Sequence, residues 1–145
     1  MSIATLVATV GAGLFAGAST YVSLVEHPAW VESGPAHALR MLGPGFRRAA
    51  VMQGGLATVS LVSAAAAWFQ GAGLGWLVGG LMLGTLIPFT LLVIGPVNRR
   101  LLDPQLDPGS REAGDLLVRW GRVHAVRTVV GVLVFGSFVG MSLRS

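Results

Sequence analysis

The sequence predicts an all-α, four-helix transmembrane bundle. Hydrophobic residues make up 53% of the 145 residues and charged residues only 11%, whereas a soluble domain averages about 25% charged residues. The mean hydropathy is +0.72. Four apolar runs, at roughly 3–25, 49–69, 74–97 and 123–143, are each long enough to cross a bilayer, which takes about 20 residues. We therefore expect a single transmembrane domain over residues 1–145.

The composition excludes several classes of function. The chain has no cysteine, which excludes disulfides, thiolate metal sites and cysteine nucleophiles. The net charge of +4 comes from arginines that flank apolar runs, and it does not indicate nucleic-acid binding because no basic patch is interleaved with aromatic residues. The first apolar run is too long for a signal peptide and has no basic segment before it, so we expect a retained helix in the lipid bilayer.

The arginines predict the orientation in the membrane. Only Arg144 lies near a terminus, whereas eight arginines lie in the two long connections between apolar runs. By the positive-inside rule, both connections are cytoplasmic and both termini are outside. We expect a multi-pass protein of the bacterial inner or plasma membrane. The arginines of the two connections are Arg40, Arg47, Arg48, Arg99, Arg100, Arg111, Arg119 and Arg122.

The sequence makes three further local predictions, which concern the connections and the end of the first helix. Residues 35–43 are predicted to form a short amphipathic helix on the inner surface, with His37 in water. Ser110 is predicted to cap a helix that starts at Arg111 and runs into the fourth span. Pro28 should end the first helix at the residue before it.

Small residues four apart recur in the apolar runs, for example Gly136 and Gly140. Such pairs let helix backbones approach closely. We expect them to serve packing within the bundle, and they would also suit a homo-oligomer.

Polar side chains from all four helices are predicted to meet at one depth near the inner face. Residues 120, 124 and 127 follow the spacing i, i+4, i+7 and share one helix face. A charge inside an apolar run should face protein or a polar cavity rather than lipid. The predicted layer comprises Glu26 and His27, Gln53, Asn98, and Trp120, His124 and Arg127, with Tyr21 deeper as its floor.

This layer suits acid–base chemistry on a bound molecule. His27 or His124 suits the role of general base, because an imidazole titrates near neutrality. Arg127, Asn98 and Gln53 suit the stabilisation of an oxyanion in a dry pocket. This chemistry requires no cofactor.

Metal chemistry is the alternative use of the same layer. His27, His124 and Glu26 supply the ligand types of a two-histidine, one-carboxylate metal site. The two histidines could also clamp a haem. Adjacent residues on a helix point about 100° apart, which makes joint ligation by Glu26 and His27 awkward.

Arg127 also needs a partner, because its charge is permanent. Of the six acidic residues, Glu26 alone abuts a spanning segment. If the first and fourth helices adjoin in an up-and-down bundle, the two side chains meet. The sequence therefore predicts an ion pair between Arg127 and Glu26.

Three stretches of the sequence carry a resemblance: residues 17–30 (GASTYVSLVEHPAW), 96–101 (PVNRRL) and 120–127 (WGRVHAVR). They resemble a family of small four-helix membrane proteins that includes the fungal anthrone oxygenases. The resemblance implies the four-helix fold and the oxidation of anthrones to anthraquinones with molecular oxygen and no established cofactor. The positions that it singles out are His27 with Pro28, Asn98, Trp120, His124 and Arg127.

The leading hypothesis is thus a membrane oxygenase that acts on a lipophilic, aromatic small molecule entering from the inner leaflet. In this hypothesis His124 or His27 removes a proton, while Glu26, Gln53, Tyr21 and Trp120 contact the substrate. Two alternatives remain: a small transporter or binding protein for an anionic, metal or haem ligand, and a structural subunit of a larger membrane complex.

Overall fold

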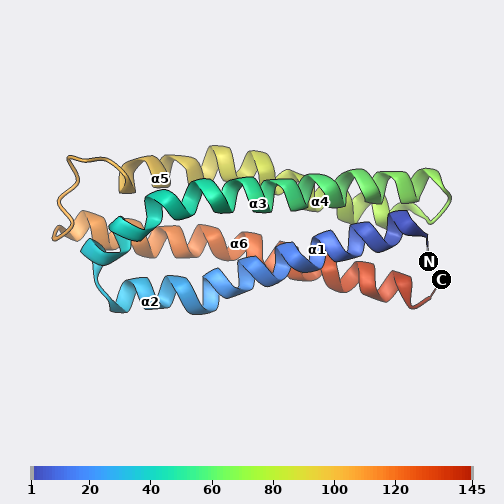
Figure 1. Ribbon diagram of the computed structural model, residues 1–145, viewed down its shortest axis with the longest axis horizontal. Helices are drawn as coiled ribbons and strands as arrows, with labels where there is room; N and C mark the ends of the chain where they lie inside the picture. Colours follow the sequence, from blue (N-terminus) through green and yellow to red (C-terminus); the bar gives the residue numbers. More distant parts are fainter. Residues whose placement is uncertain (1, 145) are drawn as a thin grey trace.

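The computed structural model describes residues 2–144, and every regular element in this range is helical. Four long helical segments run alternately up and down along the molecule (Figure 1). One π-helical turn interrupts the first segment and another interrupts the third. The elements are α1 (Ile3–Tyr21), η1 (Val22–Glu26), α2 (His27–Glu32), α3 (Pro35–Phe69), α4 (Leu74–Phe89), η2 (Thr90–Ile94), α5 (Gly95–Leu101) and α6 (Arg111–Ser142).

All four segments are long and apolar enough to cross a membrane. They contain 30, 35, 28 and 32 residues, and about 20 residues span the hydrocarbon core of a bilayer. The all-α, four-helix transmembrane fold is therefore confirmed, and the chain is an integral membrane protein. Each helical segment is longer than the apolar run predicted for it, so the bundle extends beyond those runs.

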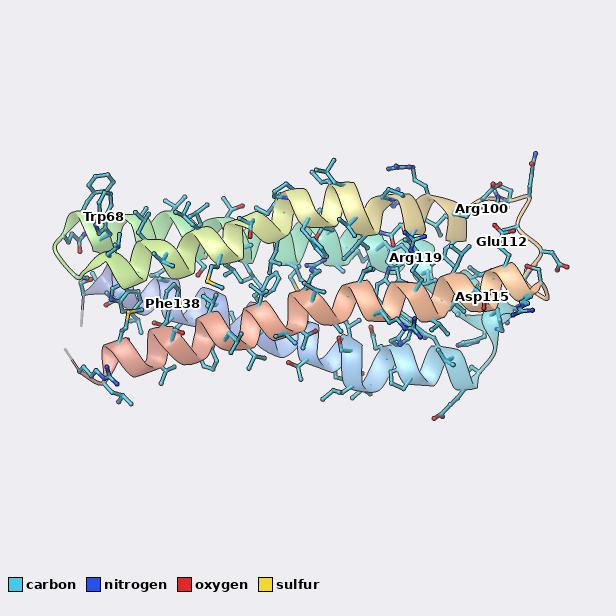
Figure 2. The ribbon with its side chains drawn as sticks, turned by 180° about the vertical axis from the view of Figure 1, so that it is seen from behind. Trp68, Arg100, Glu112, Asp115, Arg119 and Phe138 are labelled. Carbon is cyan, nitrogen blue, oxygen red and sulfur yellow. The ribbon has the colours of Figure 1, made fainter. Side chains whose placement is uncertain are left out.

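The two ends of the bundle differ in charge. Both termini and the α3–α4 turn lie at one end (Figure 1), which we call the termini end. Trp68 and Phe138 lie near this end, whereas Arg100, Glu112 and Asp115 lie toward the other (Figure 2). We call that other end, where α2 meets α3 and α5 meets α6, the arginine-rich end. Which end faces the cytoplasm stays a prediction.

The first helix does not end at Pro28, so that prediction was wrong. Helix α2 carries Pro28 in its first turn and continues to Glu32. The π-helical turn explains the difference, because the N–H of His27 bonds to the carbonyl of Val22, five residues back. This wider turn accommodates a residue without an N–H. The third segment has the same arrangement, because the π-helical turn η2 directly precedes Gly95 and Pro96.

Residues 35–43 are also corrected by the structure. They do not form a separate surface helix but are the first turns of α3, which runs unbroken past Pro44 to Phe69. Apolar side chains on these turns, such as Leu42, are buried against the ends of the other helices. The cap at Ser110 is confirmed, because its Oγ accepts a hydrogen bond from the N–H of Ala113 at 3.2 Å.

The half of the bundle toward the termini end is packed around small residues. A Cβ on Gly79 would lie 2.4 Å from Cε1 of Phe138, and one on Gly80 would lie 2.8 Å from Cβ of Ala64. Trp76 stacks on Phe138 with ring centroids 4.7 Å apart. Trp76 is thus buried within the bundle. Part of the predicted glycine packing is confirmed, although a Cβ added to Gly136 or Gly140 would meet no neighbouring helix within 4 Å among the described residues.

Candidate functional site

A pocket of about 490 Å³ lies between the helical segments in the half toward the arginine-rich end. All four segments contribute to its wall. Six of the predicted site residues line it: Glu26, Gln53, Asn98, Trp120, His124 and Arg127. His27 and Tyr21 are not among the lining residues.

The deepest polar contact joins three helices through Gln53. Its Oε1 accepts a hydrogen bond from a terminal nitrogen of Arg127 and a longer one, 3.4 Å, from Oγ of Ser19. Arg127 is only 8% exposed, and its guanidinium carbon lies 5.4 Å from the ring centroid of Phe15. Its Nε is buried with no hydrogen-bond partner among the described residues. Arg127 therefore enters the pocket wall as a cation with neutral partners.

The predicted ion pair between Arg127 and Glu26 is wrong. The ion pairs among the described residues do not include either side chain, although both line the pocket. The residue of the first segment at the level of Arg127 is Ser19. Glu26 lies seven residues further along, about 10 Å at 1.5 Å per residue. The guanidinium therefore contacts the amide of Gln53 on α3.

His124 is held by the hydroxyl groups of Ser23 and Thr128, which were not among the predicted site residues. Its Nδ1 lies 3.0 Å from Oγ of Ser23, and that oxygen lies 2.7 Å from Oγ1 of Thr128. Thr128 in turn donates to the carbonyl oxygen of Ser19 at 3.0 Å. The spacing i, i+4 was the available signal: it relates Ser19 to Ser23, and His124 to Thr128.

An aromatic wall surrounds Trp120. Its indole N–H donates to Oδ1 of Asn98 at 2.8 Å, which connects α6 to α5. The ring of His124 stacks on one side of it, with centroids 4.7 Å apart and planes at 16°, and Phe46 stacks at 5.6 Å. Trp30 packs against it at 5.6 Å. Phe46 and Trp30 were not predicted, because no local pattern relates their helices to α6.

His27 joins two helices beside the pocket. Its Nε2 lies 2.8 Å from the carbonyl oxygen of Leu117, so Nε2 must carry the proton. The ring packs against Gly121, where a Cβ would lie 2.2 Å from Cε1. The ring also packs against Trp120, with centroids 5.7 Å apart. This contact requires a glycine at 121 and ties α2 to α6.

The predicted metal ligands do not assemble. The described residues contain no group of three His, Cys, Asp or Glu side chains placed to hold a metal ion. Nε2 of His27 is committed to a carbonyl and Nδ1 of His124 to a hydroxyl. Tyr21 does not form the floor either, because 55% of its surface is exposed. These outcomes depend on how the helices pack against one another, which the spacing along a single helix does not specify.

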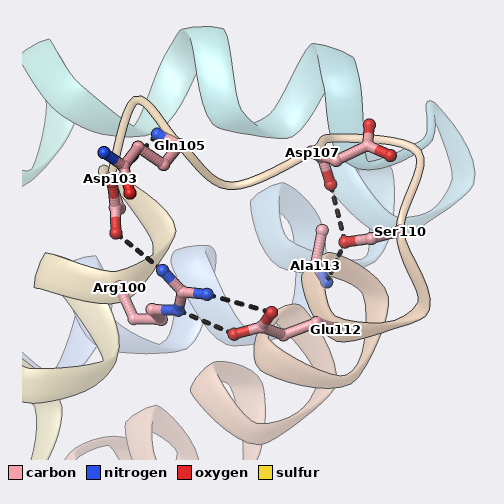
Figure 3. Close-up of polar contacts among 7 residues, drawn as sticks. All are labelled: Arg100, Asp103, Gln105, Asp107, Ser110, Glu112 and Ala113. Atoms are coloured by element: carbon pink, nitrogen blue, oxygen red, sulfur yellow. Dashed lines mark hydrogen bonds and ion pairs between the residues drawn. The ribbon is translucent and has the colours of Figure 1, made fainter.

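Charged side chains at the arginine-rich end form a separate, exposed network. Arg100 bridges Glu112 and Asp103, with N–O distances of 2.6 Å to each (Figure 3). The backbone N–H of Gln105 and the guanidinium of Arg100 lower the pKa of Asp103 below its usual range. Asp115 lies 3.8 Å from Arg111, one turn earlier on the same helix. This network lies outside the pocket.

Comparison with known proteins gives an independent result. No solved structure matches the chain. A curated relative, anthrone oxygenase tpcL of Aspergillus fumigatus, is 34% identical over 74 residues, which cover 49% of this chain and 45% of the relative. The chain thus spans about half the length of this curated relative. The sequence model of the anthrone oxygenase family matches residues 44–137, which include Gln53, Asn98, Trp120, His124 and Arg127. The chain belongs to the anthrone oxygenase family.

Proposed function

We propose that the protein is a membrane-embedded oxygenase that oxidises a lipophilic aromatic substrate of the anthrone type in the pocket. One observation carries the proposal: an aromatic wall and a buried guanidinium without an anionic partner face the same cavity. The aromatic wall suits the rings of an anthrone. The guanidinium suits the oxygen that becomes negatively charged when the substrate is deprotonated.

His124 is the general base in this proposal. It lines the pocket, and its Nε2 makes no hydrogen bond among the described residues, whereas Nδ1 is bound by Ser23. Nε2 takes a proton from the central methylene carbon of the anthrone. The electron pair of that C–H bond delocalises onto the ketone oxygen and gives an aromatic oxyanion. A positioned base contributes about 10²–10⁴-fold to such a step.

Arg127, Gln53 and Asn98 hold the oxyanion. Oε1 of Gln53 and Oδ1 of Asn98 already accept hydrogen bonds from the protein, which leaves their amide NH₂ groups as donors. Arg127 adds a buried positive charge to the pocket wall. A donor aimed at a developing oxyanion is worth about 10²–10³-fold in kcat.

The overall reaction then balances without an external reductant. The methylene carbon loses two hydrogens and gains one oxygen atom from molecular oxygen, and the second oxygen atom leaves as water. The carbon gives up four electrons and molecular oxygen accepts four. The chain's own groups move the proton and stabilise the anion, while molecular oxygen is the oxidant.

The pocket also suits entry from the membrane interface. Arg40, Arg48 and Met41 line it on the side of the arginine-rich end. We propose that this end faces the cytoplasm of a bacterial cell, as the arginine distribution favours. A lipophilic substrate with a phenolic oxygen would then enter from the inner leaflet.

The test is oxidation of a hydroxyanthrone by the purified protein in detergent. Oxygen consumption and the absorbance of the quinone give the rate, and ¹⁸O₂ gives the source of the new oxygen atom. The expected result is one ¹⁸O atom in each product molecule, with the rate lowered at least about 100-fold in His124→Ala. His37→Ala is the control, because His37 is exposed and outside the pocket.

Two results would contradict the proposal. Equal rates for wild type and His124→Ala would remove His124 as the base. A wild-type protein that binds hydroxyanthrones without oxidising them would favour a binding protein or transporter for anionic lipophilic ligands, because the same guanidinium and aromatic wall serve that function.

A further inference from the structure

The three hydroxyl and imidazole groups next to the pocket form a continuous hydrogen-bond chain. It runs from Nδ1 of His124 to Oγ of Ser23, from there to Oγ1 of Thr128, and ends at the carbonyl oxygen of Ser19. The distances are 3.0, 2.7 and 3.0 Å. Each of the three bonds joins the first segment to α6, so the chain depends on the packing of both.

Only one arrangement of protons makes all three bonds. A carbonyl oxygen can only accept, so the hydroxyl proton of Thr128 points to Ser19. Thr128 has no second hydroxyl proton, so Ser23 must donate to it. Ser23 has then used its own proton and must accept from Nδ1 of His124. The direction of the chain is therefore fixed by its terminal carbonyl.

We infer that Ser23 and Thr128 are positioning residues that hold His124 as the Nδ1–H tautomer and so make Nε2 its basic atom. This inference rests on the proposed function for its catalytic meaning. The chain keeps its direction after Nε2 has accepted a proton, because Nδ1–H still donates to Ser23. The stack on Trp120, at 4.7 Å and 16°, fixes the ring plane in addition.

His27, which lies beside the pocket, can be compared with His124 in the same protein. His27 has its Nε2 at 2.8 Å from the carbonyl oxygen of Leu117, so it must be the Nε2–H tautomer. The two histidines therefore carry their protons on opposite nitrogens. The backbone partner of His27 commits its Nε2 to donation, whereas the hydroxyl partner of His124 leaves its Nε2 free.

Nitrogen NMR of the ¹⁵N-labelled protein in detergent tests the tautomers directly. With three histidines, each can be assigned by replacing His27, His37 and His124 with glutamine in turn. We expect an unprotonated Nε2 in His124 and an unprotonated Nδ1 in His27. A neutral His124 that carries its proton on Nε2 in the wild type would overturn the inference, whatever the activity.

Variants then test the positioning role. Ser23→Ala and Thr128→Val should give mixed tautomers of His124 and lower kcat for a hydroxyanthrone by about 2- to 10-fold with KM unchanged, the factor that the loss of one hydrogen bond gives. Thr128→Ser keeps the hydroxyl group, so it should keep the single tautomer of His124 and the wild-type kcat. Thr58→Val is the matched control, because Thr58 is exposed on α3 and donates to the carbonyl of Gly54 in the same helix.

The outcomes separate the two proposals. Changed tautomers in Ser23→Ala with unchanged kcat would overturn the positioning role. The expected tautomers in a wild-type protein that oxidises no hydroxyanthrone would overturn the proposed oxygenase function and support the hydrogen-bond chain.

Discussion

The half of the bundle toward the termini end and the half toward the arginine-rich end use the same four helical segments but pack them differently. In the first half, glycines and alanines bring backbones together, and Phe138 fills the space over Gly79. In the second half, the segments surround a pocket of about 490 Å³ whose wall includes a buried cation. The first half keeps the helices in register, which allows the second to hold a cavity and an unpaired charge.

The largest expected effect is on activity, from Arg127→Met. We expect kcat/KM for a hydroxyanthrone to fall by about 10²–10³-fold, because a donor to the oxyanion is lost. The melting temperature in detergent should stay the same or rise, because a buried cation is replaced by an apolar chain of similar length. Lower stability with full activity would mean that Arg127 serves packing rather than the substrate.

A companion variant, Gln53→Glu, sharpens this test. It keeps Arg127 but places a carboxylate where the amide now accepts its hydrogen bond. The melting temperature should rise, since the cation gains an anionic partner. Affinity for an anionic hydroxyanthrone analogue should fall by at least about tenfold, because like charges then meet in the pocket.

A second prediction addresses the tightly packed half. In Gly79→Ala the new Cβ would lie 2.4 Å from Phe138, so we expect a loss of about 1–3 kcal/mol of stability, measured by thermal or denaturant unfolding in detergent. Gly136→Ala is the control, because a Cβ there meets nothing within 4 Å. Equal effects of the two variants would show that this half is not held by close glycine contacts.

A smaller loss of stability is expected at the glycine contact in the half toward the arginine-rich end. Gly121→Ala should displace the ring of His27 and break its bond to Leu117, with a loss of about 1 kcal/mol. The half-buried ring can move outward, which limits the effect. Gly114→Ala on the same helix is the control, since its Cβ has no neighbour within 4 Å. A loss larger than that in Gly79→Ala would reverse the comparison of the two halves.

The smallest effect concerns acid stability at the arginine-rich end. The pKa of Asp103 lies below its ordinary value of 3.8, mainly through the backbone N–H of Gln105. Its contribution to stability is therefore present above the ordinary value and is lost as the pH falls through the lowered pKa. The melting temperature of the wild type should fall toward that of Asp103→Asn between about pH 5 and pH 2. A constant difference between the two proteins would contradict this.

Much of the site could be read from periodicity. The spacing of Trp120, His124 and Arg127 placed them on one helix face. The free-energy cost of a charge in lipid predicted that this face points into the bundle. Gln53 and Asn98 followed from their depth in the second and third runs. These predictions depended only on helix geometry and on the distribution of arginines, both of which are local properties of the chain.

The errors arose where two helices had to be placed relative to each other. Pairing Arg127 with Glu26 required the correct level, and the structure puts Ser19 and Gln53 there instead. The error at Pro28 instead lay within one helical segment, where the π-helical turn before it accommodates a residue without an N–H.

The sequence by itself determined the four transmembrane helices, the charge difference between the ends and the residue types of the site, because hydropathy and the 3.6-residue repeat act within each helix. Only the tertiary structure decided the partners: Gln53 for Arg127, Ser23 for His124, and the Leu117 carbonyl for His27. The physical reason is that a hydrogen bond is made or lost over a few tenths of an ångström. Such distances depend on the tilt and register of packed helices, which no single run of residues specifies.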